Sequence, residues 1–141
     1  MKILVAIDGS KHALRAAKYA AGLVAQLRKP SNVTLVSVHD DTGLRHASAL
    51  VGREQVADYF RELSDNELKP ARKLLDKADV KHDVEIRKGH VAQEIVDCAS
   101  AGKFDLIVLG AKGRGAFTDL LVGSVAQRVM ALAKQPVLLV K

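Results

Sequence analysis

The chain contains 141 residues, of which 48% are hydrophobic and 27% charged, a balance that predicts one soluble globular domain over residues 1–141. Its formal net charge of +6 is spread along the sequence without a run of five basic residues, and only five residues are Phe or Tyr. Because nucleic-acid-binding proteins cluster positive charge and often stack bases on aromatic rings, we expect no nucleic-acid partner. The first apolar run, residues 3–7, is too short for a signal peptide or membrane span, so we expect a cytoplasmic protein without a membrane partner.

Short apolar runs alternate along the chain with segments of helical periodicity. The runs predict β-strands, and the segments between them have the length of helices that connect parallel strands. This alternation predicts an α/β fold, with parallel strands in one sheet and helices on both of its faces. The predicted strands are residues 3–7, 33–38, 82–88, 105–110 and 136–140, and the predicted helices are residues 10–28, 56–78, 91–99 and 122–133.

The region after the second predicted strand is less regular. Residues 40–52, DDTGLRHASALVG, predict a loop or a short irregular connection. Pro70 lies inside the predicted helix 56–78, and because proline lacks a backbone N–H and clashes with the preceding turn, we expect a kink or an interruption there. Residues 82–88 alternate between apolar and polar side chains, which predicts an edge strand with one wet face.

Two segments follow predicted strands in the way that ligand-binding loops do. In open α/β sheets, ligands bind beyond the carboxyl ends of the strands, where the winding reverses. Residues 8–10 (DGS) follow the first strand, and residues 110–124 (GAKGRGAFTDLLVGS), with four of the chain's ten glycines, follow the fourth. If the first and fourth strands are neighbours, the two segments converge on one crevice.

Neither standard phosphate-binding motif is present in the sequence. A dinucleotide fingerprint requires GxGxxG after the first strand, where this chain has only Gly9. A P-loop requires GxxxxGK[ST], and although Gly110 and Gly115 have the correct separation, Ala116 and Phe117 replace the lysine and the hydroxyl residue. The side chains that contact terminal phosphates and magnesium in a P-loop are therefore missing from those positions.

The spacing of the glycines still suits a phosphate site. Gly110 and Gly113 would allow the backbone to approach a ligand without a side-chain clash. Gly123 and Ser124 would place free amides and a hydroxyl at the start of the last helix, whose positive dipole end suits phosphate oxygens. Lys112 and Arg114 could add positive charge. A plain turn followed by a helix cap is the alternative explanation.

The sequence shows little provision for catalysis, and we predict no catalytic residue. His39 is the best placed histidine, because it follows the second strand near the same sheet edge. The sequence contains none of the spacings typical of transition-metal sites, and Cys98, within an apolar helical pattern, predicts a buried thiol. Asp8 either supports the first helix or holds Mg²⁺ through water beside bound phosphates.

Three segments carry a resemblance to a known family: VAIDGS near the N-terminus, VTLVSVHD at the second strand, and GAKGRGAFTDLLVGSVAQRVMALAKQPVLLVK at the end. They resemble the universal stress protein family, and the resemblance covers essentially the whole chain, with residues 40–80 as the weakest part. The pattern G-x2-G-x9-G-[S/T], which residues 110–124 contain, marks the ATP-binding branch of that family.

The resemblance implies a Rossmann-like fold of the adenine nucleotide alpha hydrolase type, with strand order 3-2-1-4-5. It also implies that ATP occupies the crevice between the first and fourth strands, with Mg²⁺ as a candidate companion ion. In that arrangement Asp8 faces the sugar side of the nucleotide, the backbone of Val38 reads the adenine edge, and the glycine pattern wraps the ribose and phosphates. The implied nucleotide-binding residues are Ile7, Asp8, Val38, Gly110, Gly113, Arg114, Gly115, Gly123, Ser124 and Val125.

The chain departs from the family pattern at three positions in or beside this set of residues. Ala111 stands where the family usually has Ser or Thr, Lys112 where Arg or His is common, and Ile7 where a small or polar residue is frequent. Because losing one hydroxyl weakens a phosphate contact by about 1 kcal/mol, the departures concern affinity more than the site itself.

The sequence therefore predicts an ATP-binding regulatory module of the stress response, with at most slow ATP turnover, and not an enzyme. A nucleotide-free interaction protein of the same fold and a slow ATP hydrolase are the alternatives. A nucleotidyl transferase is disfavoured, because DGSKHA follows the first strand where an HxGH-like motif would stand. The apolar last strand, from Pro136 to Val140, is expected at a sheet edge, and both this edge and the family resemblance predict a homodimer through it.

Overall fold

The computed structural model describes residues 1–114 and 121–141, except for the side chains of residues 43–45 and 47. Strands and helices alternate along the chain, apart from two consecutive helices between the second and third strands. The elements are β1 (Lys2–Ala6), α1 (Lys11–Gln26), β2 (Asn32–His39), α2 (Thr42–Val51), α3 (Arg53–Lys77), β3 (His82–Lys88), α4 (Val91–Ala101), β4 (Leu106–Gly110), α5 (Ser124–Leu132) and β5 (Val137–Val140).

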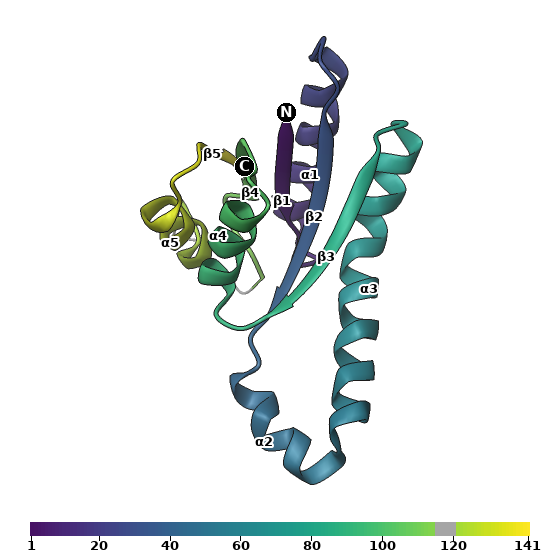
Figure 1. Ribbon diagram of the computed structural model, residues 1–141, viewed down its shortest axis with the longest axis vertical. Coiled ribbons are helices and arrows are strands. Elements are labelled where there is room, and N and C mark those ends of the chain that lie inside the picture. The colour runs from purple at the N-terminus through teal and green to yellow at the C-terminus, as the bar shows by residue number, and fades with distance from the viewer. Residues whose placement is uncertain (115–120) are drawn as a thin grey trace.

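The strands form one parallel sheet in the order β3-β2-β1-β4-β5, which confirms the predicted fold class and strand order (Figure 1). β1 lies at the centre and pairs with β2 on one side and β4 on the other, so that Ile3 is opposite both Val33 and Leu106. The chain winds from β1 towards β3 in one direction and from β4 to β5 in the other. The winding therefore reverses between β1 and β4, where a crevice forms beyond the carboxyl ends of the strands.

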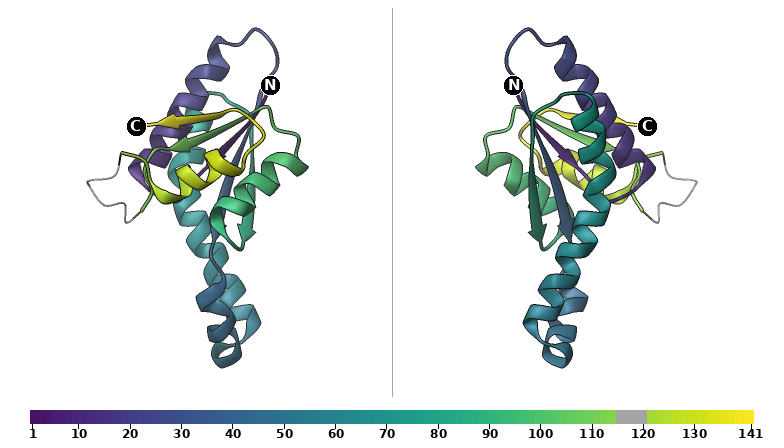
Figure 2. Two further views of the ribbon diagram at one scale, coloured as in Figure 1. Left: turned by 90° about the vertical axis from the view of Figure 1, so that its left-hand side faces the viewer. Right: turned by 90° about the vertical axis from the view of Figure 1, so that its right-hand side faces the viewer.

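Two helices cover each face of the sheet, α1 and α3 on one and α4 and α5 on the other (Figure 2). Side chains of β1 alternate between the two cores: Ile3 and Val5 pack beneath α1 and α3, and Leu4 packs on the side of α4 and α5. All three are fully buried, and each such burial stabilises the fold by about 1.5–3 kcal/mol. The continuous apolar run of β1 thus serves both faces, as expected of a central parallel strand.

The loop predicted at residues 40–52 is wrong, because most of this segment forms α2. α2 contacts α3, which begins at Arg53 instead of residue 56, and it leaves Leu50 88% exposed. Figure 1 shows α2 and the first part of α3 extending beyond the carboxyl end of β2. A helix that packs along one neighbouring helix and not on the sheet needs no long apolar stripe, so its periodicity in the sequence is weak.

Of the two outcomes expected at Pro70, a kink or an interruption, the interruption is wrong, because α3 runs continuously through this residue. Pro70 cannot donate to the carbonyl of Asn66 one turn earlier, but both residues lie on the exposed face, where water can solvate that carbonyl. Leu68 and Ala71, on the opposite face, are buried against the sheet and hold the helix in place. None of the helices in the described ranges is both long and apolar enough to cross a membrane.

Candidate functional site

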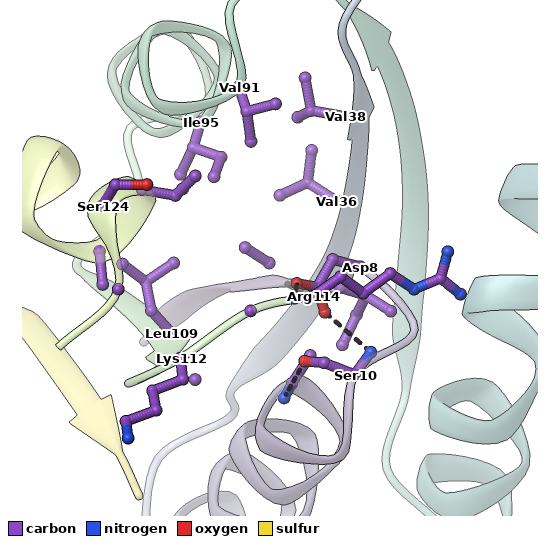
Figure 3. Close-up of a pocket in the computed structure, with 18 residues that line it drawn as sticks. Asp8, Ser10, Val36, Val38, Val91, Ile95, Leu109, Lys112, Arg114 and Ser124 are labelled. Atoms are coloured by element: carbon purple, nitrogen blue, oxygen red, sulfur yellow. Dashed lines mark hydrogen bonds between the residues drawn. The ribbon is translucent and has the colours of Figure 1, made fainter. Parts of the chain in front are cut away.

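A cavity of about 390 Å³ opens where the winding reverses, on the side of the sheet that α4 and α5 cover (Figure 3). Small-molecule sites typically enclose roughly 300–1,000 Å³. Of the ten implied nucleotide-binding residues, Gly115 lies outside the described residues, and the structure brings the other nine together in the lining of this one cavity. These nine are Ile7, Asp8, Val38, Gly110, Gly113, Arg114, Gly123, Ser124 and Val125.

One wall of the cavity is aliphatic. Val36 and Val38 come from β2, Val91 and Ile95 from α4, and Leu109 from β4, and Figure 3 shows them facing the same space. Only Val38 was predicted from the sequence. The strand period of two connects Val36 to Val38, and the helix period of four connects Val91 to Ile95, so each pair carries a signal once one member is placed. Such a wall suits a flat apolar group.

Asp8 joins the two loops on the opposite side of the cavity. Its Oδ1 accepts a hydrogen bond from the backbone N–H of Ser10 at 2.9 Å, and its Oδ2 accepts one from the backbone N–H of Arg114 at 3.2 Å. Ser10 caps α1, as its Oγ accepts a hydrogen bond from the backbone N–H of Ala13 at 3.1 Å. The helix-supporting role considered for Asp8 is therefore present, and the carboxylate also ties the loop after β4 to the loop after β1.

The first two glycines of the loop after β4 make room for other parts of the chain, which differs from the ligand approach expected from the sequence. A Cβ on Gly110 would lie 2.7 Å from the backbone carbon of His12 and 2.8 Å from the nitrogen of Ala13, in the first turn of α1. A Cβ on Gly113 would lie 2.6 Å from Oδ2 of Asp8. These positions require glycine because α1 and Asp8 approach the backbone closely.

The N-termini of α1 and α5 both face the cavity. The first i to i−4 bond of α5 runs from the N–H of Gln127 to the carbonyl of Gly123 at 3.0 Å, so the amides of Ser124 and Val125 have no acceptor within the helix. The N–H of Gly123 bonds the carbonyl of Ala111 at 2.7 Å and so closes the base of the loop. Two positive helix ends at one cavity provide a favourable potential for an anionic group.

The side chain of Arg114 reaches a buried carboxylate, Glu67 of α3, which was not predicted from the sequence. Nη1 of Arg114 lies 3.0 Å from Oε1 of Glu67, and Nε2 of His39 lies 3.3 Å from Oε2. Burial raises the pKa of Glu67, although the charge of Arg114 opposes this shift. Burial, together with the charge of Arg114, lowers the pKa of His39. Helical spacing places Glu67 on the same face of α3 as buried Phe60 and Ala71, which is the only sequence signal for its burial.

Ser37, His39 and Glu67 are the residue types of a hydrolase triad, but their geometry is unsuitable. The Oγ of Ser37 and the Oε2 of Glu67 both contact the same ring nitrogen of His39, at 3.3 Å each, whereas a triad needs the acid on the other nitrogen. Ser37 is also fully buried, and none of the three lines the cavity. Within the described ranges, no group of three His, Cys, Asp or Glu side chains could hold a metal ion.

Comparison with known proteins identifies the family. The model of the universal stress protein family matches residues 1–141. The chain belongs to the universal stress protein family. It is 34% identical to universal stress protein MJ0531 of Methanocaldococcus jannaschii over 140 residues, which cover 99% of this chain and 81% of the relative.

Solved structures share the fold of this chain. The hypothetical protein MJ0577 has a TM-score of 0.85 at 27% identity, with 99% of this chain and 94% of that chain covered. The universal stress protein from Archaeoglobus fulgidus, in complex with dAMP, shares the fold with a TM-score of 0.69 at 24% identity, with 100% and 98% covered.

The departures from the family pattern occupy different places in this universal stress protein. Ala111 is buried and does not line the cavity; its N–H donates to the carbonyl of Val140 at 2.7 Å, and its carbonyl accepts from Gly123. Lys112 and Ile7 do line the cavity. Of the three departures, only Ala111 contributes nothing to the described lining of the cavity.

Proposed function

We propose that this universal stress protein binds ATP in the cavity between β1 and β4 and acts in the cytoplasm as a regulatory module, not as an enzyme. One observation carries the proposal: a single cavity combines an aliphatic wall with the positive ends of two helices. Adenine has apolar faces and the phosphates are anionic, so an adenine nucleotide matches both sides. The dAMP complex of the Archaeoglobus fulgidus protein supports the proposal at the level of the fold.

In the proposed complex, adenine lies against the aliphatic wall, between Val38 of β2 and Ile95 of α4, and the backbone of Val38 reads its edge. The phosphates lie at the N-terminus of α5, where the amides of Ser124 and Val125 are available to donate hydrogen bonds. Lys112 lines the same cavity and adds positive charge. Asp8, on the side opposite the aliphatic wall, faces the ribose.

Mg²⁺ is proposed to enter with the phosphates of ATP. Asp8 is the only acidic residue in the described lining of the cavity. Each of its oxygens accepts one backbone N–H, and because a carboxylate offers about four lone-pair positions, each oxygen retains capacity for a water molecule. Mg²⁺ usually keeps several waters and binds one or two carboxylates, so contact through water is the arrangement that Asp8 fits.

ATP turnover is proposed to be slow because the described lining contains no histidine that could act as a general base. Asp8, its one carboxylate, is held by two backbone amides that belong to different loops. These contacts suit a residue that shapes the site and not one that moves protons.

We also propose a homodimer through β5. This strand lies at the edge of the sheet, and among the described residues it pairs only with β4. An edge strand presents unpaired N–H and C=O groups, which a second copy of the strand can satisfy.

The binding proposal is tested by titrating the protein with Mg-ATP in a calorimeter, for the wild type and two matched variants. Val38→Phe places a ring in the proposed adenine space, and we expect it to weaken binding by about tenfold or more, since overpacking costs roughly 1–3 kcal/mol. Val84→Phe adds the same ring to β3, outside the cavity lining, and should bind as the wild type does.

Equal affinity of both variants would place the nucleotide elsewhere. If the wild type shows neither binding heat nor a melting shift with millimolar Mg-ATP, the nucleotide-free interaction protein becomes the better account. Parallel titrations with AMP and GTP measure the preference for ATP.

A further inference from the structure

Glu67 is a charged group held inside the protein, away from the cavity. It belongs to α3, on the opposite face of the sheet, and its side chain is only 5% exposed. A buried carboxylate is costly unless each oxygen finds a partner. Oε1 contacts Nη1 of Arg114 at 3.0 Å, and Oε2 contacts Nε2 of His39 at 3.3 Å. One oxygen therefore bonds to the end of β2 and the other to the loop after β4.

The ion pair between Arg114 and Glu67 passes across the turn that connects β1 to α1. A Cβ on Gly9 of this turn would lie 2.6 Å from Nη2 of Arg114 and 3.1 Å from Cγ of Glu67. Gly9 also has φ of +79°, a conformation that side chains rarely adopt. The turn thus leaves a passage that the ion pair fills, and a side chain at position 9 would require the guanidinium of Arg114 to shift.

The backbone of Arg114 is held separately from its side chain, by Asp8. Its N–H donates to Oδ2 of Asp8 at 3.2 Å, while its guanidinium points away from the cavity (Figure 3). Gly113, the preceding residue, lies against the same carboxylate oxygen. A single residue, held by its side chain on α3 and by its backbone on Asp8, therefore fixes this part of the cavity rim.

We propose that Glu67 is a positioning residue for the nucleotide site: through the side chain of Arg114 it holds residues 110–114 in the conformation that forms the cavity rim. The proposal rests on the proposed function, because the rim matters for affinity only if a nucleotide binds there. Exposed ion pairs contribute little to stability, but the Glu67 carboxylate of this pair is almost fully buried. Loss of the guanidinium partner from a buried carboxylate is costly, so Glu67 favours the conformation in which Arg114 reaches it.

The test uses Glu67→Gln, Arg114→Gln and the double variant, with two readouts. Glu67→Gln preserves shape and hydrogen bonding but removes the charge, and we expect the dissociation constant for Mg-ATP to rise about 3- to 10-fold. In the ligand-free protein, the amide of Arg114 should exchange its hydrogen roughly tenfold faster. Glu62→Gln, on the exposed side of α3, is the matched control and should change neither quantity.

The double variant separates positioning from a general structural role. If Glu67 acts through Arg114, then Glu67→Gln changes neither readout further once Arg114 is replaced, because the contact is already lost. Additive effects in the double variant would overturn the proposal. Unchanged ATP binding in Glu67→Gln would also overturn it, because the rim would then not depend on Glu67. Tighter binding would overturn it as well, because Glu67 would then hold Arg114 away from the phosphates.

Failure of the proposed function is distinguishable from failure of this inference. If the wild type binds no nucleotide, the proposed function fails, and hydrogen exchange at Arg114 in the ligand-free protein still decides whether Glu67 positions the rim. Unchanged exchange in Glu67→Gln would overturn the inference regardless of nucleotide binding.

Discussion

Replacing Gly110 by alanine tests how closely α1 approaches the end of β4. The added Cβ would lie 2.7 Å from the carbonyl carbon of His12 and 2.8 Å from the nitrogen of Ala13. Carbon atoms in van der Waals contact are about 3.5–4.0 Å apart, so the first turn of α1 must move by about 0.8 Å or more. Both contacts are backbone atoms, which cannot move aside by a change of rotamer.

The expected cost follows from this overlap. Overpacking in a well-packed core typically costs about 1–3 kcal/mol, and the reduced freedom of alanine in the unfolded chain offsets about 0.4–1 kcal/mol of it. With an unfolding entropy of about 2.1 cal/mol/K per residue over 141 residues, a net loss of about 1.3 kcal/mol lowers the melting temperature by about 4 °C. Because Ala13 of α1 and its N-cap Ser10 line the cavity, Mg-ATP binding should also weaken.

Urea unfolding and calorimetry measure the loss, with Gly22→Ala as the matched control. Gly22 lies in the same helix, and a Cβ there meets nothing within 4 Å. Alanine should therefore leave stability unchanged or raise it by up to about 1 kcal/mol, the difference in helix propensity. If Gly110→Ala unfolds at the same urea concentration as the wild type, α1 is not held against β4 as described, and the reasoning fails.

Two further predictions concern the thiol and the sheet edge. Cys98 is buried, as predicted, with 1% of its surface exposed, and burial together with the nearby charge of Glu85 raises its pKa to about 12. Iodoacetamide at a pH near 8 should therefore label Cys98 only when the protein is unfolded. Rapid labelling of the native protein would contradict the packing of α4. At the sheet edge, the carbonyls of Pro136 and Val140 accept hydrogen bonds from Ile107 and Ala111, so the backbone N–H and C=O of Leu139 point away from β4. Leu139→Pro should therefore convert the proposed dimer to a monomer in light scattering without disrupting the sheet, and a wild type that is already monomeric at micromolar concentration would refute the dimer.

Much of the site follows from the sequence because its determinants are local. Strands buried on both faces are continuous apolar runs, and the residues that follow them must emerge at one edge of a parallel sheet. That reasoning places Asp8 after β1 and Gly110 at the end of β4, and the structure brings both to the same cavity. It does not reveal why Gly110 is glycine, because the atoms that require it belong to α1.

The sequence by itself determined the fold class, the strands, and the loops that meet at the cavity, since periodicity and turn residues are properties of short segments. Only the tertiary structure decided that residues 42–51 form a helix, that Pro70 is tolerated, and that Glu67 is buried beside Arg114. In the sequence Glu67 is one of many charges on an amphipathic helix. Its burial depends on β2, on the turn at Gly9 and on the loop after β4, which are distant along the chain and become neighbours only when the sheet forms.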